Sequence, residues 1–446
     1  MMFKTALLST ILLGAIACES SKPASNEPPT TPADTVDTVP SADKPADPPA
    51  TPVVDAEPSA ALTKPGDPAP LAEASNALAF DLYKTQSARE GNLAFSPASI
   101  SLAFAMTYAG ANGATAAQMK EVLHLPADDA LQSSAAGLLK SWNADTAGYE
   151  LNVVNRLFGE AGYTFEKPFL EIAKNTYQAP LENLSFRTDP EAQRLHINNW
   201  VLEQTEQRIA DLLPKMSITK DTRLVLTNAV YFLGKWKNAF EKDDTKEQAF
   251  FVNGGTKANV PMMHQTAKFD VASVTGARLL RMPYAGGNLA MTIVLPKAKT
   301  GLSTIEQELD AATYKEWSKK LGQRSEKVNL ALPSFEIANA ELPLKEALKT
   351  LGMKLAFDVA GADFTKMANP ENDADKLYIS GAFHKAFVKV DESGTEAAAA
   401  TAVVMATKGA APAPPKAFVV DRPFMFTIED TESGALLFVG RVVDPR

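Results

Sequence analysis

The spacing of apolar residues predicts helices and then strands from about residue 71 onward. Apolar side chains recur at helical spacing in residues 71–82, 99–108, 116–123, 197–205 and 340–351. Short runs rich in branched and aromatic residues, typical of strands, occupy residues 223–232, 260–263, 277–282, 289–295, 328–332, 382–390, 417–420, 424–429 and 435–443. The regular strand–helix alternation of a parallel sheet is missing. This order predicts an α+β fold in which helices pack on a large mixed or antiparallel sheet.

The first 70 residues differ in composition from the rest of the chain. Residues 6–17 are an apolar stretch after Lys4, too short to span a bilayer as a helix but typical of a secretory signal. Residues 19–70 contain 13 prolines, nine acidic residues, three lysines and no aromatic residue, so they cannot bury enough apolar surface to fold. The sequence therefore predicts a signal peptide (1–17), a disordered acidic segment (18–70) and one folded domain (71–446).

Cys18 is the only cysteine in the chain, and it directly follows the apolar stretch. Together with Ala15, Ile16 and Ala17 it resembles the lipobox at which bacterial lipoproteins are cleaved and acylated. The resemblance implies an exported protein held on a membrane through lipidated Cys18, on its periplasmic or extracellular side. The alternative is an ordinary signal peptide with a chance cysteine. A single cysteine also excludes an internal disulfide framework.

Charge and motif content narrow the function further. The net charge is −9, which argues against a protein that binds nucleic acid through basic patches. The four histidines lack metal-ligand spacing, and we expect neither a metal nor a cofactor. Common catalytic signatures such as G-x-S-x-G, H-E-x-x-H and the P-loop are absent from the sequence. An enzyme whose catalytic groups are dispersed along the chain stays an alternative.

Two polar residues stand in predicted strands. His384 shares a strand face with Ala386, Val388 and Val390, which predicts a buried side chain. Asn228 stands within an apolar run and is expected to be a buried amide. We interpret both as hydrogen-bonded core residues in preference to catalytic groups.

Within residues 391–422, about 27 residues without apolar periodicity lie between two predicted strands, and segments of this length are usually functional. At a period of two residues, one face is uncharged throughout and holds Thr395, Ala397, Ala399, Thr401, Val403 and Met405. The opposite face holds Glu396, Ala398, Ala400, Ala402 and Val404. Gly394 supplies a permissive hinge. This pattern suits a segment that is a loop in one state and a central strand in another, and an alanine-rich helix or flexible loop is the alternative.

Several spaced motifs make residues 71–446 resemble the serpin family from end to end. The segment KVDESGTEAAAAT (389–401) resembles the serpin hinge, and FVVDRPFMFTI (418–428) resembles the family's C-terminal signature. Further similar segments are NLAFSPASISLAFAMTYAGANGATAAQMKEVLHL (92–125), LTNAVYFLGKWKNAF (226–240), LPSF (332–335) and LKTLGMKLAFDVAGADF (348–364). The small-residue hinge is the version found in inhibitory serpins.

The resemblance implies a monomeric suicide inhibitor of a serine protease, with a cysteine protease as a further possible target. The protease attacks an exposed loop, and the cut loop enters the main sheet as a new strand. Counting from the hinge places the scissile bond between Lys408 and Gly409, which fits a trypsin-like protease; cleavage at Met405 or Thr407 is the alternative. A non-inhibitory serpin that acts as a binding or structural protein is the second reading.

The resemblance also assigns roles to residues outside the scissile bond. The implied hinge consists of Glu392, Gly394, Thr395, Glu396, Ala397, Ala398, Ala399, Ala400 and Thr401. Four residues match the polar cluster, called the shutter, beneath the point where the sheet opens: Ser96, Ser99, Asn228 and His384. Trp236 matches the tryptophan near the top of the sheet, where insertion begins.

Overall fold

Three β-sheets organise the part of the chain that the computed structural model describes, residues 63–144, 148–253, 255–395 and 415–446. All of these residues belong to one compact unit, Pro58–Arg446. Within it the α-helices are α1 (Ala69–Gln86), α2 (Pro97–Ala109), α3 (Gly113–Val122), α4 (Asp128–Trp142), α5 (Lys167–Asn175), α6 (Pro190–Gln204), α7 (Leu302–Glu308), α8 (Ala311–Leu321) and α9 (Leu344–Leu351). Short 3-10 turns are η1 (Lys242–Asp244), η2 (Leu355–Phe357) and η3 (Asp373–Asp375).

The described residues contain strands at all nine predicted runs and six further strands that the sequence pattern did not predict. The strands are β1 (Leu93–Phe95), β2 (Tyr149–Glu160), β3 (Leu181–Leu184), β4 (Leu224–Lys235), β5 (Lys246–Val252), β6 (Thr256–Ser273), β7 (Ala277–Pro283), β8 (Leu289–Pro296), β9 (Ser325–Pro333), β10 (Phe335–Leu342), β11 (His384–Val390), β12 (Gly394–Thr395), β13 (Lys416–Val419), β14 (Phe424–Asp430) and β15 (Leu436–Val442). Together with the helices, they confirm the predicted α+β fold.

The largest sheet has nine strands in the order β1-β15-β14-β8-β7-β6-β9-β13, with β5 paired to β6. A second sheet has the order β12-β4-β2-β3, and β10 and β11 form a separate pair. Most pairings are antiparallel, whereas β2–β3 and β9–β13 are parallel. The sheets are therefore mixed.

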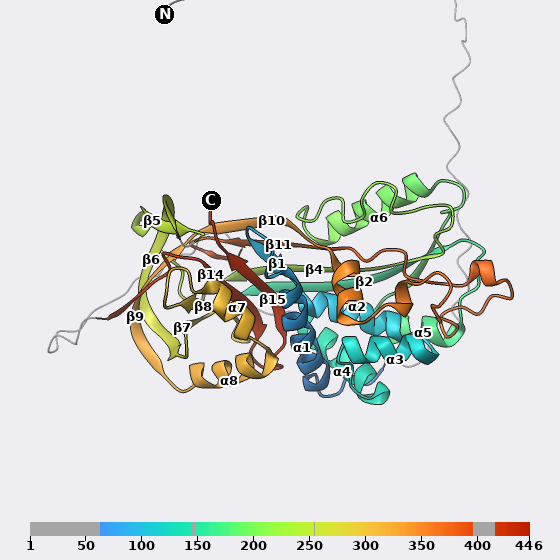
Figure 1. The fold of residues 1–446 in the computed structure, drawn as a ribbon, viewed down its shortest axis with the longest axis horizontal. Helices are drawn as coiled ribbons and strands as arrows, with labels where there is room; N and C mark the ends of the chain where they lie inside the picture. Colours follow the sequence, from blue (N-terminus) through green and yellow to red (C-terminus); the bar gives the residue numbers. More distant parts are fainter. Residues whose placement is uncertain (1–62, 145–147, 254, 396–414) are drawn as a thin grey trace, which may run out of the picture. The chain divides into compact units, whose positions relative to one another are not determined.

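Helices cover both faces of the long strand pair β2 and β4. Figure 1 shows α6 on one side of these strands and α2 to α5 on the other. Contacts of α2 with β4, of α4 with β2 and of α6 with both strands support this arrangement. α8 contacts β6 and β7 of the large sheet. Covering both faces explains why β4 has a nearly unbroken apolar sequence.

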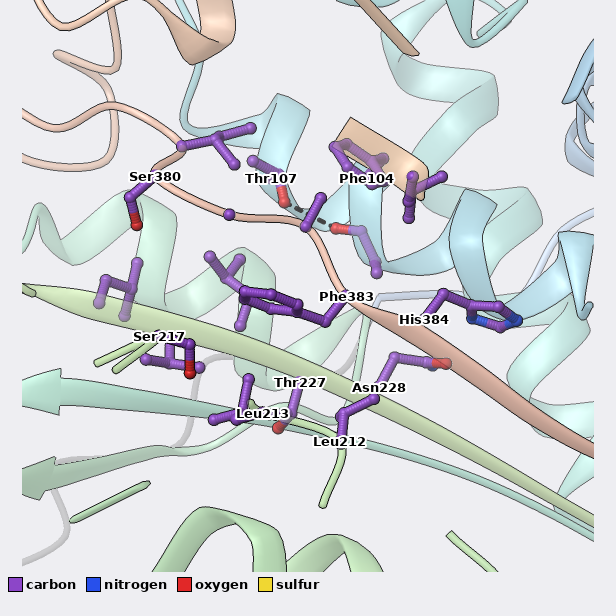
Figure 2. A pocket seen from close by; sticks show the side chains of 18 of the residues that line it. Phe104, Thr107, Leu212, Leu213, Ser217, Thr227, Asn228, Ser380, Phe383 and His384 are labelled. Carbon is purple, nitrogen blue, oxygen red and sulfur yellow. Dashed lines mark hydrogen bonds between the residues drawn. The ribbon is translucent and has the colours of Figure 1, made fainter. Parts of the chain in front are cut away.

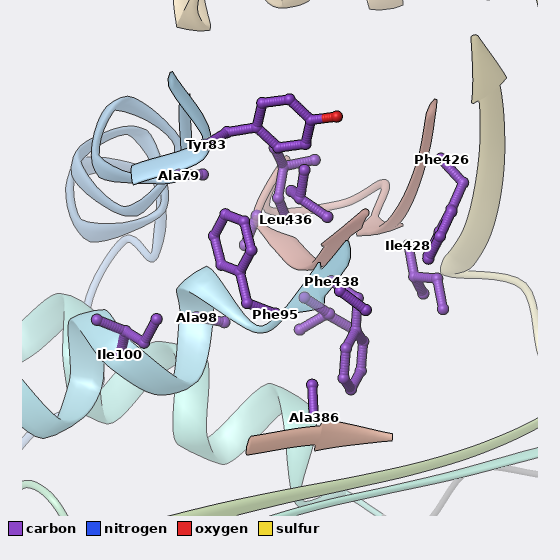
Figure 3. Packing of buried hydrophobic residues seen from close by; sticks show 14 of the residues in the cluster. Ala79, Tyr83, Phe95, Ala98, Ile100, Ala386, Phe426, Ile428, Leu436 and Phe438 are labelled. Atoms are coloured by element: carbon purple, nitrogen blue, oxygen red, sulfur yellow. The ribbon is translucent and has the colours of Figure 1, made fainter. Parts of the chain in front are cut away.

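The core joins the first helices to the last strands. Tyr83 of α1, Phe95 of β1 and Phe438 of β15 pack together, and Ala386 of β11 lies beside them (Figure 3). Tyr83 and Phe95 are fully buried. Residues far apart in sequence thus share one hydrophobic cluster, and burial of such side chains stabilises the fold by about 2 kcal/mol each.

A buried ion pair joins α7 to β15, and α1 is hydrogen-bonded to the carboxylate of this pair. Arg441 Nη1 lies 2.8 Å from Glu306 Oε1, and both side chains are about 5% exposed or less. Tyr83 OH donates to the same carboxylate at 2.7 Å. Arg441 also donates to the backbone carbonyl groups of Ser87, Arg89 and Gly91. The full set of hydrogen bonds compensates the desolvation of both charges.

Two boundaries differ from the sequence-based prediction. The predicted helix 340–351 is α9, which begins only at Leu344, and residues 340–342 belong to β10. The predicted disordered segment ends before residue 70, because Thr63 and Gly66 donate backbone hydrogen bonds to Asn175 and Ser133. α1 then begins at Ala69. Residues 63–70 are therefore part of the folded unit.

Cys18 and the predicted signal peptide lie outside the described residues. Within the described part of the chain, the helices are all too short or too polar to cross a membrane.

Candidate functional site

A tight turn at residues 391–395, here called the hinge turn, leads from β11 into β12, which pairs with β4. Asp391 Oδ1 accepts hydrogen bonds from Ser393 N at 2.9 Å, Ser393 Oγ at 3.0 Å and Gly394 N at 3.3 Å. Asp391 N donates to the carbonyl of Gly394 at 3.0 Å. The turn folds the chain back, so that Gly394 and Thr395 pair with Lys235 and Gly234 of β4. The short strand β12 therefore already occupies one end of the edge of β4.

Gly394 is the one residue of this turn that has no space for a side chain. A Cβ atom there would collide with the carbonyl oxygen of Gly234. Thr395 follows and is 4% exposed. Its hydroxyl forms a 2.6 Å hydrogen bond with Tyr284 OH. Burial raises the pKa of Tyr284 far above its ordinary value, so this phenol stays neutral.

Trp236 and the side chain of Glu392 make further hydrogen bonds that hold the hinge turn in place. Trp236 Nε1 donates to the carbonyl of Asp391 at 3.0 Å, and its backbone N–H donates to the carbonyl of Ser393 at 2.9 Å. Its ring stacks on Tyr284 with centroids 4.5 Å apart and planes 13° apart. The Glu392 carboxylate accepts from Thr245 Oγ1 at 2.7 Å. Backbone and side-chain contacts together thus define the turn.

Two polar pairs lie at the middle of β4. Ser96 N donates to His384 Nε2 at 3.0 Å, and Ser99 Oγ donates to Asn228 Oδ1. Ser96 and Ser99 belong to the start of α2, where Ser96 Oγ accepts from Ser99 N at 3.2 Å as an N-cap. The structure thus brings together the four residues that the sequence assigned to the shutter.

His384 is 7% exposed, as the strand pattern predicted. Burial lowers its pKa from 6.5 to about 4. Its Nε2 is occupied as an acceptor by a backbone N–H and does not activate a serine hydroxyl. The geometry is therefore that of a neutral structural histidine.

The sequence predicted that Asn228 is a buried amide, but the residue is only partly buried in the structure. Its Nδ2 donates to Asn155 Oδ1 at 2.7 Å, and Asn155 Nδ2 donates to the carbonyl of Tyr177 at 2.8 Å. Asn155 stands directly opposite Asn228 in the β2–β4 register. The sequence reading missed Asn155, although an asparagine within the alternating pattern of residues 149–160 was a signal that could have identified it.

One edge of β4 is paired throughout, from Leu224 opposite Gly159 to Gly234 opposite Tyr149. The other edge pairs with β12 alone, at Gly234 and Lys235, within the described part of the chain. β11, which borders the same region, pairs with β10 and with no other strand that the structure describes. We call the region between β4 and β11 the strand gap. Unpaired backbone groups of this kind readily accept a further strand.

A cavity of about 200 Å³ lies in the strand gap. Residues 223–230 line it on one side, and residues 376–386, which lead into β11, line it on another. Figure 2 shows Phe383 beside β4, with His384 and Asn228 at one end of the cavity. Phe383 is 38% exposed although it is large and apolar. The gap is therefore incompletely filled by side chains.

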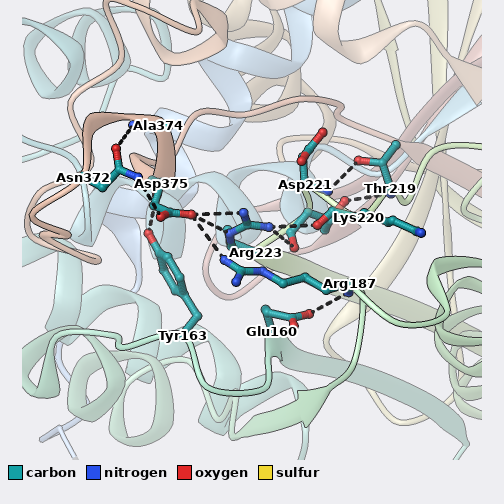
Figure 4. Close-up of polar contacts among 11 residues, drawn as sticks. Glu160, Tyr163, Arg187, Thr219, Lys220, Asp221, Arg223, Asn372, Ala374 and Asp375 are labelled. Carbon is teal, nitrogen blue, oxygen red and sulfur yellow. Dashed lines mark hydrogen bonds and ion pairs between the residues drawn. The ribbon is translucent and has the colours of Figure 1, made fainter.

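A cluster around Asp375 holds the end of the strand gap near the start of β4 (Figure 4). Asp375 Oδ1 accepts from Arg223 Nη2 at 3.1 Å and from Arg187 Nη2 at 3.3 Å. Tyr163 OH donates to the carbonyl of Asp375 at 2.6 Å. Burial, followed by the charge of Asp375, raises the pKa of Tyr163 to about 12. The segment that precedes β11 is thereby fixed to the first residues of β4.

The remaining predicted site residues lie outside the described part of the chain. They are Glu396, Ala397, Ala398, Ala399, Ala400, Thr401, Lys408 and Gly409. Among the described residues, no group of three or more histidine, cysteine or acidic side chains is arranged to hold a metal ion.

Within the described residues, one edge of β4 is thus paired at one end only, by the last two residues of the hinge turn. The serpin (serine protease inhibitor) family model matches residues 73–445. An uncharacterized serpin-like protein of Thermococcus kodakarensis is 37% identical over 453 residues, which cover 100% of both chains. Leukocyte elastase inhibitor A of Rattus norvegicus is 36% identical over 383 residues, or 84% of this chain and 99% of that protein.

The structure of uncleaved ovalbumin is also similar, with a TM-score of 0.74 and 28% identity, over 85% of this chain and all of that chain. The chain belongs to the serpin family, and its fold is the serpin fold. Serpins are mostly protease inhibitors, not enzymes.

The buried, neutral state of His384 makes the stability of the protein depend on pH. Above pH 6.5 the imidazole is mainly neutral in both the folded and the unfolded protein, so it adds no pH dependence to the free energy of unfolding. Between pH 6.5 and about 4 the unfolded chain binds a proton that the folded chain does not bind, so stability falls as pH falls. We expect this residue to contribute a loss of about 3 kcal/mol by pH 4.

The measurement is the urea midpoint of wild type and His384→Gln between pH 7 and 4. The variant is expected to lose less stability over this range than wild type. His264→Gln, which removes a half-buried histidine bonded to Gln248, is the matched control and should follow the wild-type slope. Equal slopes for wild type and His384→Gln would contradict the prediction.

Proposed function

We propose that this serpin is an inhibitor that traps a trypsin-like serine protease by inserting its cleaved loop into the strand gap. The observation that carries the proposal is the unpaired edge of β4, which β12 already enters at Gly394 and Thr395. The uncharged small residues that follow the hinge suit a strand buried between β4 and β11. The serpin family includes a named elastase inhibitor among the relatives of this chain.

The proposed covalent step is an incomplete proteolysis. The protease serine Oγ attacks the carbonyl carbon of Lys408, and its proton passes through the protease histidine to the departing amine of Gly409. The ester to Lys408 replaces the peptide bond. Insertion of the freed strand then carries the attached protease away before water hydrolyses the ester. Lys408 suits a specificity pocket that contains a carboxylate.

The direct test mixes the full-length chain with trypsin and analyses the mixture on a denaturing gel. We expect a covalent band at the summed mass, and a C-terminal fragment that begins at Gly409 by mass spectrometry. Lys408→Gln is the matched variant and should lose the band with trypsin. Cleavage without a complex and without a gain in thermal stability would overturn the proposal in favour of a binding or structural serpin. Cleavage at Met405 or Thr407 would overturn the assignment of the scissile bond.

Thr395 supplies a second test that separates cleavage from insertion. Its hydroxyl is buried against Tyr284, so an arginine at this position would place a charge in a site without a compensating acid, at a cost of several kcal/mol. We expect Thr395→Arg to be cleaved by trypsin while the yield of covalent complex falls by at least about tenfold, because insertion is slowed relative to hydrolysis. Thr395→Ser, which keeps the hydroxyl, should retain the complex. An undiminished yield in Thr395→Arg would show that this residue need not be buried.

We also propose that the protein is exported as a monomer and anchored to a membrane through lipidated Cys18. The support is the short apolar stretch that ends at the only cysteine of the chain. In bacterial cells given labelled palmitate, wild type should incorporate the label and partition with membranes. Cys18→Ala should do neither, whereas incorporation of label by Cys18→Ala would contradict the proposed site.

A further inference from the structure

A compact group of basic side chains surrounds the strand that follows the predicted reactive loop. Lys257 and Lys299 are both exposed and both face the ring of Phe251, with Nζ 5.5 Å and 3.3 Å from its centroid. Phe251 N donates to the carbonyl of Asp421 at 2.7 Å, so this ring lies beside the residues that follow β13. The aromatic ring holds two ammonium groups close together at the surface.

Three further cations continue the same surface toward β13. Arg422 Nη1 donates to the carbonyl of Lys297 at 2.8 Å, and the Lys297 side chain is exposed. Arg278 lies over the ring of Phe418 at 4.6 Å and donates to the carbonyl of Ala417 at 2.9 Å. Burial, followed by the positive charge of Arg422, lowers the pKa of Arg278. We call Lys257, Lys297, Lys299, Arg278 and Arg422 the basic surface.

Local acids compensate the basic surface only in part. Asp421 pairs with Arg422 at 2.7 Å. Glu326, the other acid near Arg278, pairs with Lys416 at 3.0 Å. Among the described residues, Lys257, Lys297, Lys299 and Arg278 have no ion-pair partner. The basic surface has a defined position next to β13, because Arg278 contacts Phe418 and Ala417.

We propose that the basic surface is a secondary binding site for an acidic surface of the protease that attacks the reactive loop. This inference rests on the proposed inhibitory function. A protease engaged at the loop must lie against the surface around β13, because Lys416 follows the loop directly. Opposite charges would raise the rate of encounter and select acidic proteases among those that share the same cleavage specificity. An anionic membrane is the less favoured partner, because β13 ties this surface to the loop.

The test uses two trypsins of the same specificity and opposite net charge, anionic and cationic trypsin. The variant is the full-length chain with Lys257→Gln and Lys299→Gln, and the matched control carries Lys167→Gln and Lys174→Gln on α5, at the other side of the fold (Figure 1). The measured quantity is the second-order rate constant of covalent-complex formation at low and at high salt. Equal urea midpoints verify that both variants are folded.

With anionic trypsin at low salt, we expect the rate constant of the Lys257/Lys299 variant to fall by roughly 3- to 10-fold. The difference should vanish at about 0.5 M salt, because exposed charges are then screened. The control variant should match wild type, and cationic trypsin should react equally with all three proteins or faster with the Lys257/Lys299 variant. An unchanged rate with anionic trypsin, or an equal loss with both trypsins, would overturn the inference.

Two further measurements separate this inference from the proposed function. Cleavage of the loop without a covalent complex would contradict the proposed inhibitory function alone. The rate of loop cleavage by the two trypsins would then be compared between wild type and the Lys257/Lys299 variant. If neither trypsin reacts with wild type, both proposals are contradicted. The partner would be a membrane and not the protease under two conditions. Wild type, but not the Lys257/Lys299 variant, would bind phosphatidylglycerol vesicles, and the substitutions would leave the rate constant with anionic trypsin unchanged.

Discussion

The unpaired edge of β4 is the constraint on which the rest of this structure depends. Backbone N–H and C=O groups in a protein interior normally have partners, and leaving them without a paired strand is unfavourable. Here the edge facing β11 is paired only at Gly234 and Lys235 within the described residues. Under the proposed mechanism, a further strand would supply the missing partners, and the surrounding contacts keep the strand gap in place.

Those contacts act at three levels along the strand gap. At one end, Trp236 and Glu392 hold the hinge turn. In the middle, the start of α2 binds β11 through His384 and binds β4 through Asn228. At the other end, Asp375 ties the segment before β11 to Arg223. The start of α2 therefore links the two strands that border the strand gap. In the proposed mechanism, one of these two links would have to break before the gap could widen.

Sequence patterns located five of the nine helices and nine of the fifteen strands that the structure describes, and the family resemblance indicated the shutter residues. Both missed contacts that are distant along the chain. The helix expected at residues 340–351 begins later because Pro343 disfavours a helical conformation in the preceding residue. Residues 340–342 belong to β10, which pairs with β11. The paired residues are 42 positions apart at Leu342–His384 and 55 positions apart at Phe335–Val390. Tyr284 and Asn155 were missed because their importance arises from partners on other strands. Local periodicity contains no information about such pairs.

One strand connects the two places where the reactive loop is attached. β7 begins beside Arg278, which contacts β13, and leads to Tyr284, which contacts Thr395 of the hinge turn. Six residues of extended chain separate Arg278 and Tyr284, or roughly 20 Å. β7 is paired on both sides, with β6 and β8, so this separation is fixed. In the proposed mechanism, an intact loop would have to enter the strand gap while β13 still holds the residues that follow it. Cutting the loop would remove this restraint, so the fixed separation along β7 fits a mechanism in which insertion follows cleavage.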